Sequence, residues 1–145
     1  MTQEDKSLLL KDLCARLPYN VKCHVPTYNC AMTLTGKRLN YFCFHKDEWG
    51  IDYSQEIETV LDPLNDQNND YVVKPYLRPM SSMTEEKINE FILISDTVLW
   101  LGNKRSSCIL SLEQMDWLNA NHFDYRNLIG KGLALEAKKG MYGEA

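Results

Sequence analysis

The sequence predicts an α+β protein with an N-terminal helix, a small and mostly antiparallel sheet, and C-terminal helices packed on that sheet. Three observations support this fold class. Apolar residues have helical spacing near the N-terminus, alternate as in strands between about residues 20 and 45, and regain helical spacing after residue 83. Because strands and helices are segregated along the chain, α+β is favoured over an alternating α/β arrangement.

Length and composition set the class of protein. A chain of 145 residues is expected to form a single domain that folds without a metal or a disulfide. The net charge of −4 argues against nucleic-acid binding, which needs a basic face. Five irregularly spaced cysteines and a polar N-terminus indicate a reduced, cytosolic protein. No apolar run has the length of a membrane span. The sequence leaves the oligomeric state open.

The N-terminal helix is predicted to begin after Thr2, a residue type that caps helices, and to end before Pro18. Leucines at 3–4 spacing give this helix one apolar face: Leu9, Leu10, Leu13 and Leu17. Residues 20–25 then alternate between apolar and polar, which is typical of a half-buried strand. Pro26 ends that strand or places it at an edge of the sheet.

Two further strands are predicted at 31–35 and 38–45, joined by a two-residue hairpin turn at Gly36-Lys37. Apolar residues on both faces of 38–45 indicate a strand that is central or covered by a helix. Residues 46–64 show both helical and strand spacing, so their structure stays open. The polar run at 65–70 is predicted to be a flexible loop within the single domain.

The segment 71–79, YVVKPYLRP, contains two prolines and is therefore predicted to be an extended edge strand. Alternation places Lys74, Tyr76 and Arg78 on one side of it. These three residues are candidate binding residues, because a proline-stiffened segment loses little entropy when it docks on a partner. The alternative is a rigid connector between the sheet and the helices.

Capping residues predict two more helices. One begins after Thr84 and the other after Ser111, whose side chain can form a capping box with Gln114. The second should end near residues 119–121, because asparagine competes for backbone hydrogen bonds. The residues expected to face the core are Ile88, Phe91, Ile92 and Leu99 in the first helix and Leu112, Met115 and Leu118 in the second.

The run HFDYR after the last helix holds the densest cluster of polar groups. In one interpretation His122 acts as a general acid–base oriented by Asp124, while Arg126 holds an anion, as in a small hydrolase-like enzyme. In the other, Asp124 or His122 caps backbone groups, Arg126 pairs with a carboxylate, and Phe123 and Tyr125 anchor the run in the core. The second interpretation expects a solvated His122.

No metal and no cofactor are predicted. The possible zinc ligands lack the close pairs of known zinc sites and include adjacent residues that would point to opposite faces of a strand: Cys23, His24, Cys30, Cys43 and His45. The acidic stretch 47–58 lacks the spacing of a calcium loop. No phosphate-binding loop, dinucleotide fingerprint or nucleophile elbow is present.

Three segments occur in the order LLLKDLCARLPYNVK, VKPYLRPMSSMT (73–84) and DWLNANHFDYRNLIGKGLALEA (116–137). Together they resemble a family of small uncharacterised proteins of gut bacteria, their prophages and mobile elements; Asn127 stands where relatives usually carry glycine. The resemblance implies an accessory protein of bacterial or phage origin that works in the cytoplasm, and it transfers no activity. Because catalytic motifs are missing, the favoured function is a non-enzymatic module that binds a host or phage protein.

Overall fold

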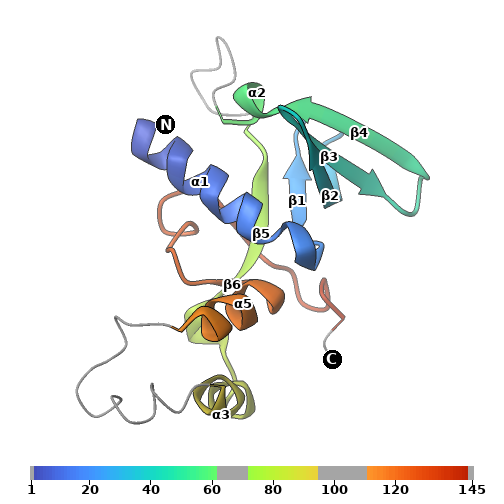
Figure 1. Cartoon of the computed structure of the whole chain (residues 1–145). Helices are drawn as coiled ribbons and strands as arrows, with labels where there is room; N and C mark the ends of the chain where they lie inside the picture. The colour runs from blue at the N-terminus through green and yellow to red at the C-terminus, as the bar shows by residue number, and fades with distance from the viewer. Residues whose placement is uncertain (1, 62–71, 95–110, 144–145) are drawn as a thin grey trace.

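The computed structural model describes residues 2–61, 72–94 and 111–143 and has the predicted α+β class (Figure 1). The helices are α1 (Gln3–Ala15), α2 (Ile57–Leu61), α3 (Glu85–Leu93) and α5 (Leu112–Ala120), with two 3-10 turns, η1 (Leu17–Tyr19) and η2 (Met80–Ser82). The strands are β1 (Lys22–Val25), β2 (Cys30–Arg38), β3 (Tyr41–Lys46), β4 (Ile51–Glu56), β5 (Lys74–Pro79), β6 (Phe123–Asp124) and β7 (Leu135–Glu136). Their order is β4-β3-β2-β1-β5-β6, and β7 also pairs with β5.

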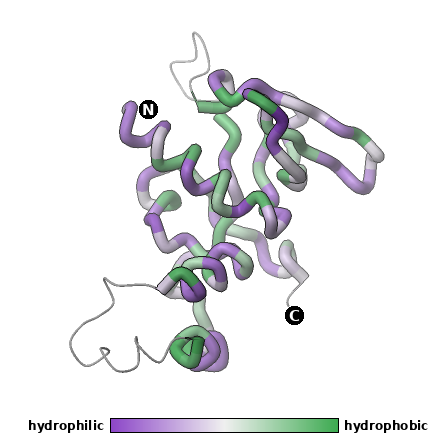
Figure 2. The backbone as a smooth tube through the Cα atoms, viewed as in Figure 1, coloured by the Kyte–Doolittle hydropathy of each residue, from purple (hydrophilic) through white to green (hydrophobic). Residues whose placement is uncertain are grey.

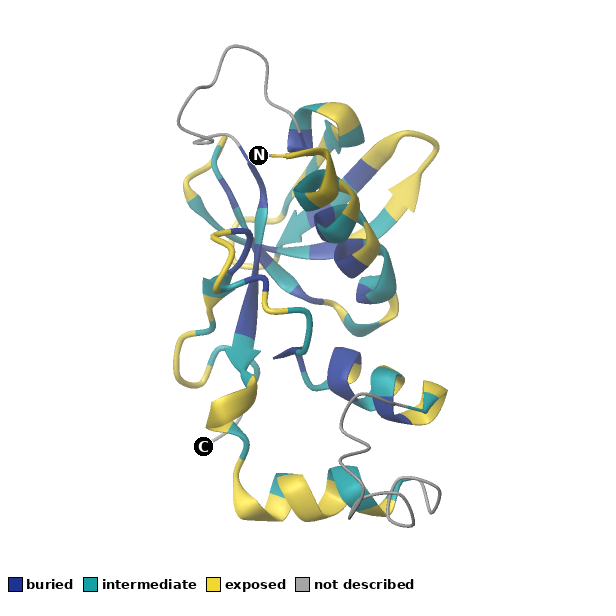
Figure 3. Cartoon of the chain, turned by 90° about the vertical axis from the view of Figure 1, so that its left-hand side faces the viewer, coloured by how far each residue is buried: buried dark blue, intermediate teal, exposed yellow. Residues whose placement is uncertain are grey.

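Helix α1 begins where its capping residue predicts. The Thr2 hydroxyl accepts a hydrogen bond from the Asp5 backbone N–H at 3.0 Å, and the Asp5 carboxylate accepts one in return from the Thr2 N–H at 3.1 Å. The helix ends at Ala15, and Pro18 lies in η1. Leu9 and Leu13 are fully buried. Figure 3 shows that α1 has buried as well as exposed residues along its length. The predicted apolar face is therefore the face that covers the sheet.

The sheet supplies the other half of the core. Alternation in β1 is confirmed, since Val21, Cys23 and Val25 are fully buried and the strand ends before Pro26. Strand β3 lies between β2 and β4, which is the central position that its apolar faces predicted. The side chains that complete the core under α1 include Met32, Leu34, Phe42, Phe44, Val60, Val73 and Leu77.

The predicted turn at Gly36-Lys37 is wrong. Strand β2 continues to Arg38, which pairs with Tyr41, so the two turn residues are Leu39 and Asn40. Leu39 takes the left-handed conformation, with φ of 53°. Gly36 instead lies at a shift of register between β2 and β3, where a glycine accommodates a β-bulge.

The segment left open by the sequence, 46–64, contains both kinds of element. Strand β4 covers Ile51–Glu56, and helix α2 follows it directly at Ile57–Leu61. The strand pattern and the helical pattern were therefore both present, one after the other. The loop predicted at 65–70 lies outside the described residues, as do Leu99 and Cys108.

The extended segment around Pro75 forms β5, but it is not an edge strand. Its first residues pair antiparallel with β1, and its later residues pair in parallel with β7 and β6. Figure 1 shows β5 running from the sheet toward α3 and α5. Because β6 and β7 have only two residues each, no alternation in the sequence indicated these partners.

The caps at Thr84 and Ser111 and the end of α5 at Ala120 are confirmed. Of the residues predicted to face the core, Leu118 is fully buried, whereas the other described ones are not. Helix α3 has no buried residue, and Ile88 is 41% exposed. Figure 2 shows hydrophobic residues on one side of α3 and hydrophilic residues on the other. In α5, Leu112 is 74% exposed, and the buried side chains are Gln114, Leu118 and Asn119. In the described part of the chain, no helix is long and apolar enough to cross a membrane.

Candidate functional site

The HFDYR run begins at the C-terminal end of α5. His122 takes the left-handed conformation, with φ of 64°, and its N–H donates to the Asn119 carbonyl at 3.1 Å. This is the usual position for a helix-ending residue, and histidine adopts it more readily than most residues. The turn directs Phe123 into the interior, where it is 2% exposed and stacks on Trp117 at 5.8 Å between ring centroids. Phe123 is therefore an anchor, as the structural interpretation proposed.

Asp124 is fully engaged with the backbone. One carboxylate oxygen accepts from the Leu128 N–H at 2.8 Å and the other from the Ile129 N–H at 2.9 Å. Asp124 is also 7% exposed. The carboxylate thus fixes the turn that follows the run. Among the described residues, no hydrogen bond joins it to His122.

Arg126 belongs to a buried ionic network with α1. Its Nη1 donates to Asp12 Oδ1 at 2.8 Å, while Arg16 Nε donates to Asp12 Oδ2 at 2.9 Å. Arg16 Nη2 also donates to the Phe123 carbonyl at 2.6 Å. Asp12 and Arg16 are fully buried, so this network ties the first helix to the HFDYR run in the interior.

Asp12 and Arg16 were not among the residues predicted from the sequence, although a signal for them exists. With Leu9 and Leu13 they follow the 9, 12, 13, 16 spacing of a single helical face. Two charged residues of opposite sign on an otherwise apolar face indicate a buried ion pair, because a charge is rarely buried without a partner.

His122 is buried, so the expectation that it is solvated is wrong. It is 7% exposed, and its ring stacks on Tyr142 with centroids 3.7 Å apart. Burial, followed by the nearby positive charges of Arg16, Arg78 and Lys22, lowers the pKa of His122 from 6.5 to about 4. The imidazole is therefore neutral at physiological pH.

Tyr142 packs against the same region. Its hydroxyl donates to the Tyr76 carbonyl at 2.7 Å and accepts from the Lys22 N–H at 3.0 Å. Burial raises the pKa of Tyr142. Arg78 lies with its guanidinium 5.6 Å from the Tyr142 ring centroid and 5.7 Å from that of Phe123. The aromatic rings thus hold Arg78 in one position.

The three candidate catalytic residues are not brought together. His122 stacks on Tyr142, Asp124 binds backbone N–H groups, and Arg126 binds Asp12. None of the three lines any of the cavities described below. A general acid–base pair needs hydrogen-bond geometry at a cavity that admits substrate, and this arrangement does not supply it.

The candidate binding residues have three different environments. Tyr76 is 6% exposed, with Lys138 Nζ 6.0 Å from its ring centroid. Lys74 is partly exposed beside its strand partner His24. Arg78 is the member of the set that lines a cavity.

That cavity, which we call the basic groove, has a volume of about 290 Å³. It lies between the end of β5, the start of α3 and the segment after β7. Its charged lining residues come from all three: Arg78, Lys87, Glu136, Lys138 and Lys139. Four cationic residues and one acidic residue therefore line the groove, and Lys87 Nζ also lies 3.8 Å from Glu90 Oε2. Lys138 and Lys139 also line a second cavity, of about 320 Å³, against the sheet, where Lys22 and Lys46 add further positive charge beside Asp47 and Glu48.

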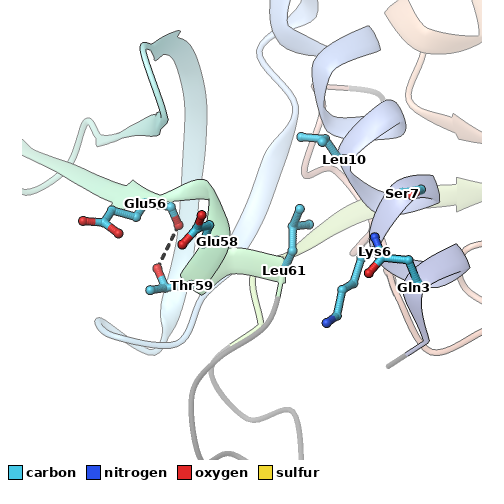
Figure 4. A pocket seen from close by; sticks show the side chains of 8 residues that line it. All are labelled: Gln3, Lys6, Ser7, Leu10, Glu56, Glu58, Thr59 and Leu61. Atoms are coloured by element: carbon cyan, nitrogen blue, oxygen red, sulfur yellow. Dashed lines mark hydrogen bonds between the residues drawn. The ribbon is translucent and has the colours of Figure 1, made fainter.

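A third cavity, of about 510 Å³, lies between α1 and the β4–α2 junction (Figure 4). Its charges are mixed, because Lys6 lies across from Glu56 and Glu58. Thr59 Oγ1 donates to the Glu56 carbonyl at 2.8 Å. Within the ranges the structure describes, no group of three or more His, Cys, Asp or Glu side chains is arranged to hold a metal ion. Among these three cavities, the basic groove has the most one-sided charge.

Comparisons with protein-family models, with curated proteins and with solved structures found no match to this chain.

Proposed function

We propose that the protein is a non-enzymatic binding module whose basic groove takes an acidic segment of a partner protein. The observation that carries this proposal is the convergence of Arg78, Lys87, Lys138 and Lys139 on one cavity with the single carboxylate of Glu136. The chain as a whole has a net charge of −4, so this concentration of positive charge is local. Arginine and lysine side chains bind carboxylates with charge-assisted hydrogen bonds.

The position of Arg78 supports recognition rather than general attraction. Its guanidinium lies within 6 Å of the ring centroids of both Phe123 and Tyr142, and these contacts reduce the side-chain entropy that is lost when it binds a carboxylate. Lys138 and Lys139 are exposed and complete the rim. An arginine held by aromatic contacts, with exposed lysines at the rim, suits an acidic peptide, whose carboxylates are spaced along an extended chain.

An acidic peptide is favoured over a nucleic acid. Single-stranded nucleic acids bind through exposed aromatic platforms as well as through positive charge. The aromatic residue that lines the basic groove is Phe123, which is 2% exposed and cannot stack on a base.

The context comes from the resemblance to small proteins of gut bacteria and their phages. On that basis the partner is a host or phage protein met in the cytoplasm, and the chain is an accessory protein without catalytic activity. The alternative hydrolase has less support, because His122, Asp124 and Arg126 are each engaged in separate structural contacts.

Fluorescence anisotropy with a labelled octaglutamate peptide tests the proposal. We expect saturable binding that weakens with salt and falls about tenfold or more in the double variant Lys138→Glu, Lys139→Glu. Lys131→Glu is the matched control, because Lys131 is an exposed lysine outside the groove lining. Equal loss in the control, or tighter binding of single-stranded DNA than of the peptide, would contradict the proposal.

A further inference from the structure

Strand β4 (Ile51–Glu56) forms one edge of the sheet. Among the described residues it pairs with β3 on one side and with no strand on the other (Figure 1). Every second residue of such a strand directs its N–H and C=O groups away from the sheet. These groups can pair with an extended segment of another chain, which is recognition by strand addition. The six residues span about 20 Å.

The two faces of β4 differ in chemistry. On the inner face, Ile51 and Tyr53 pack partly buried against the core, and Tyr53 stacks on Phe44 at 6.3 Å between centroids. On the outer face, Asp52, Ser54 and Glu56 are exposed. Residues directly opposite each other in a sheet share a face. An added strand would therefore place apolar residues beside the inner face and cationic residues opposite Asp52 and Glu56.

A cavity of about 460 Å³ lies beside the middle of β4. Its lining includes small side chains from three adjacent strands, Thr35, Cys43 and Ser54, and Cys43 pairs directly with Ser54. Leu39 and Tyr41, which are 83% and 37% exposed, add apolar surface. A large side chain opposite Ser54 can reach across this short residue into the cavity, because aromatic side chains contact diagonal neighbours in a sheet.

A second copy of the chain is a poor occupant of this edge. In a symmetric antiparallel pair centred on Ser54, Asp52 would lie opposite Glu56 of the other copy. In a pair centred on Asp52, two Asp52 carboxylates would oppose each other, and in one centred on Tyr53 they would be diagonal neighbours. Like charges directly opposite in a sheet are destabilising.

We infer that the β4 edge accepts, by strand addition, an extended segment of a partner protein with the pattern basic–apolar–aromatic–apolar–basic. The two basic residues lie opposite Asp52 and Glu56, and the aromatic residue enters the cavity beside Ser54. This surface is independent of the basic groove, since no residue lines both cavities.

The test uses the full chain and a labelled peptide that contains Lys-Val-Phe-Val-Lys. We expect saturable binding by anisotropy, together with slower amide hydrogen exchange at alternate residues of β4. Replacing the peptide phenylalanine by alanine, or its lysines by glutamates, should weaken binding. Ser54→Lys should weaken binding about fivefold by placing a like charge on the edge, whereas the matched control Ser54→Thr should not.

Failure of the peptide to bind would overturn the inference. So would binding that leaves β4 amide exchange unchanged, because that result would show attraction to the acidic surface without strand pairing. The variant Lys138→Glu, Lys139→Glu should bind this peptide normally. A loss there would mean that the peptide contacts the basic groove region instead.

Discussion

Helices α1 and α3 begin in the same way and end up in different environments. Each has a threonine cap, Thr2 or Thr84, with two acidic residues in the first turn. Yet α1 buries Leu9, Leu13 and a charged pair, while α3 buries no residue at all. The difference shows that capping and periodicity report where a helix forms, whereas burial depends on what the rest of the chain brings to its face.

The two helices should differ most in the loss of unfolding free energy when the buried Asp12 of α1 is replaced. Replacing Asp12 by alanine leaves the fully buried Arg16 without its carboxylate, and the expected loss is about 3–5 kcal/mol of unfolding free energy. Glu86→Ala, at an exposed position in the first turn of α3, should change it by less than about 0.5 kcal/mol. Urea denaturation measures both. Similar small effects would show that the Asp12 network contributes little.

Trp117 offers a second test, because its ring contacts one aromatic ring from the buried interior and one from the exposed helix α3. Phe123 packs at 5.8 Å and is 2% exposed, while Phe91 of α3 packs at 5.5 Å and is only partly buried. We expect Phe123→Ala to cost about 3–5 kcal/mol and Phe91→Ala about 1 kcal/mol. Equal costs in denaturant melts would place α3 in the same packed core as the HFDYR run.

The pKa of His122 gives stability a pH dependence. The folded pKa of about 4 lies below the unfolded value of 6.5, so the unfolded state binds more protons between these values. Stability from this group is fully present above pH 6.5 and is lost progressively as the pH falls to 4, by about 2–3 kcal/mol. Urea melts of wild type and His122→Asn measure it; asparagine also adopts the left-handed conformation. If the unfolding free energy of His122→Asn fell with pH as steeply as that of the wild type, a buried neutral His122 would be contradicted.

The helix caps should give the smallest effects, and they sharpen the contrast between elements. Ser111→Ala in α5 should lower global stability by about 1 kcal/mol, and Thr2→Ala in α1 by a similar amount. Thr84→Ala should leave the global midpoint nearly unchanged, because α3 can lose its first turn without exposing core residues. Denaturant midpoints decide between these outcomes. If Thr84→Ala lowered global stability as much as Thr2→Ala does, α3 would unfold together with the core.

The structural features that the sequence predicted correctly are local ones. The caps at Thr2, Thr84 and Ser111, the end of α5 among asparagines and the alternation of β1 all depend on residues within a few positions of one another. The turn after β2 was misplaced because Gly36 fits either a turn or a bulge, and only the register with β3 distinguishes them.

What the sequence did not predict depends on distant contacts. Asp12 and Arg126 are 114 positions apart, and Lys22 and Tyr142 are 120 apart. Pairing with β1, β6 and β7, which are distant in sequence, likewise makes β5 an interior strand, and Tyr142 stacks on the buried His122. The basic groove shows the same limit, since Arg78 was a candidate from its own segment, while Lys138 and Lys139 joined it only through the fold.

Native-state hydrogen exchange compares the two helices most directly. We predict that amides near Leu13 in α1 exchange only through global unfolding, while those near Phe91 in α3 exchange through local opening several kcal/mol lower in free energy. The free energy of exchange should also depend less on denaturant concentration in α3 than in α1. Equal protection and equal denaturant dependence in the two helices would contradict the claim that α3 lies outside the cooperative core.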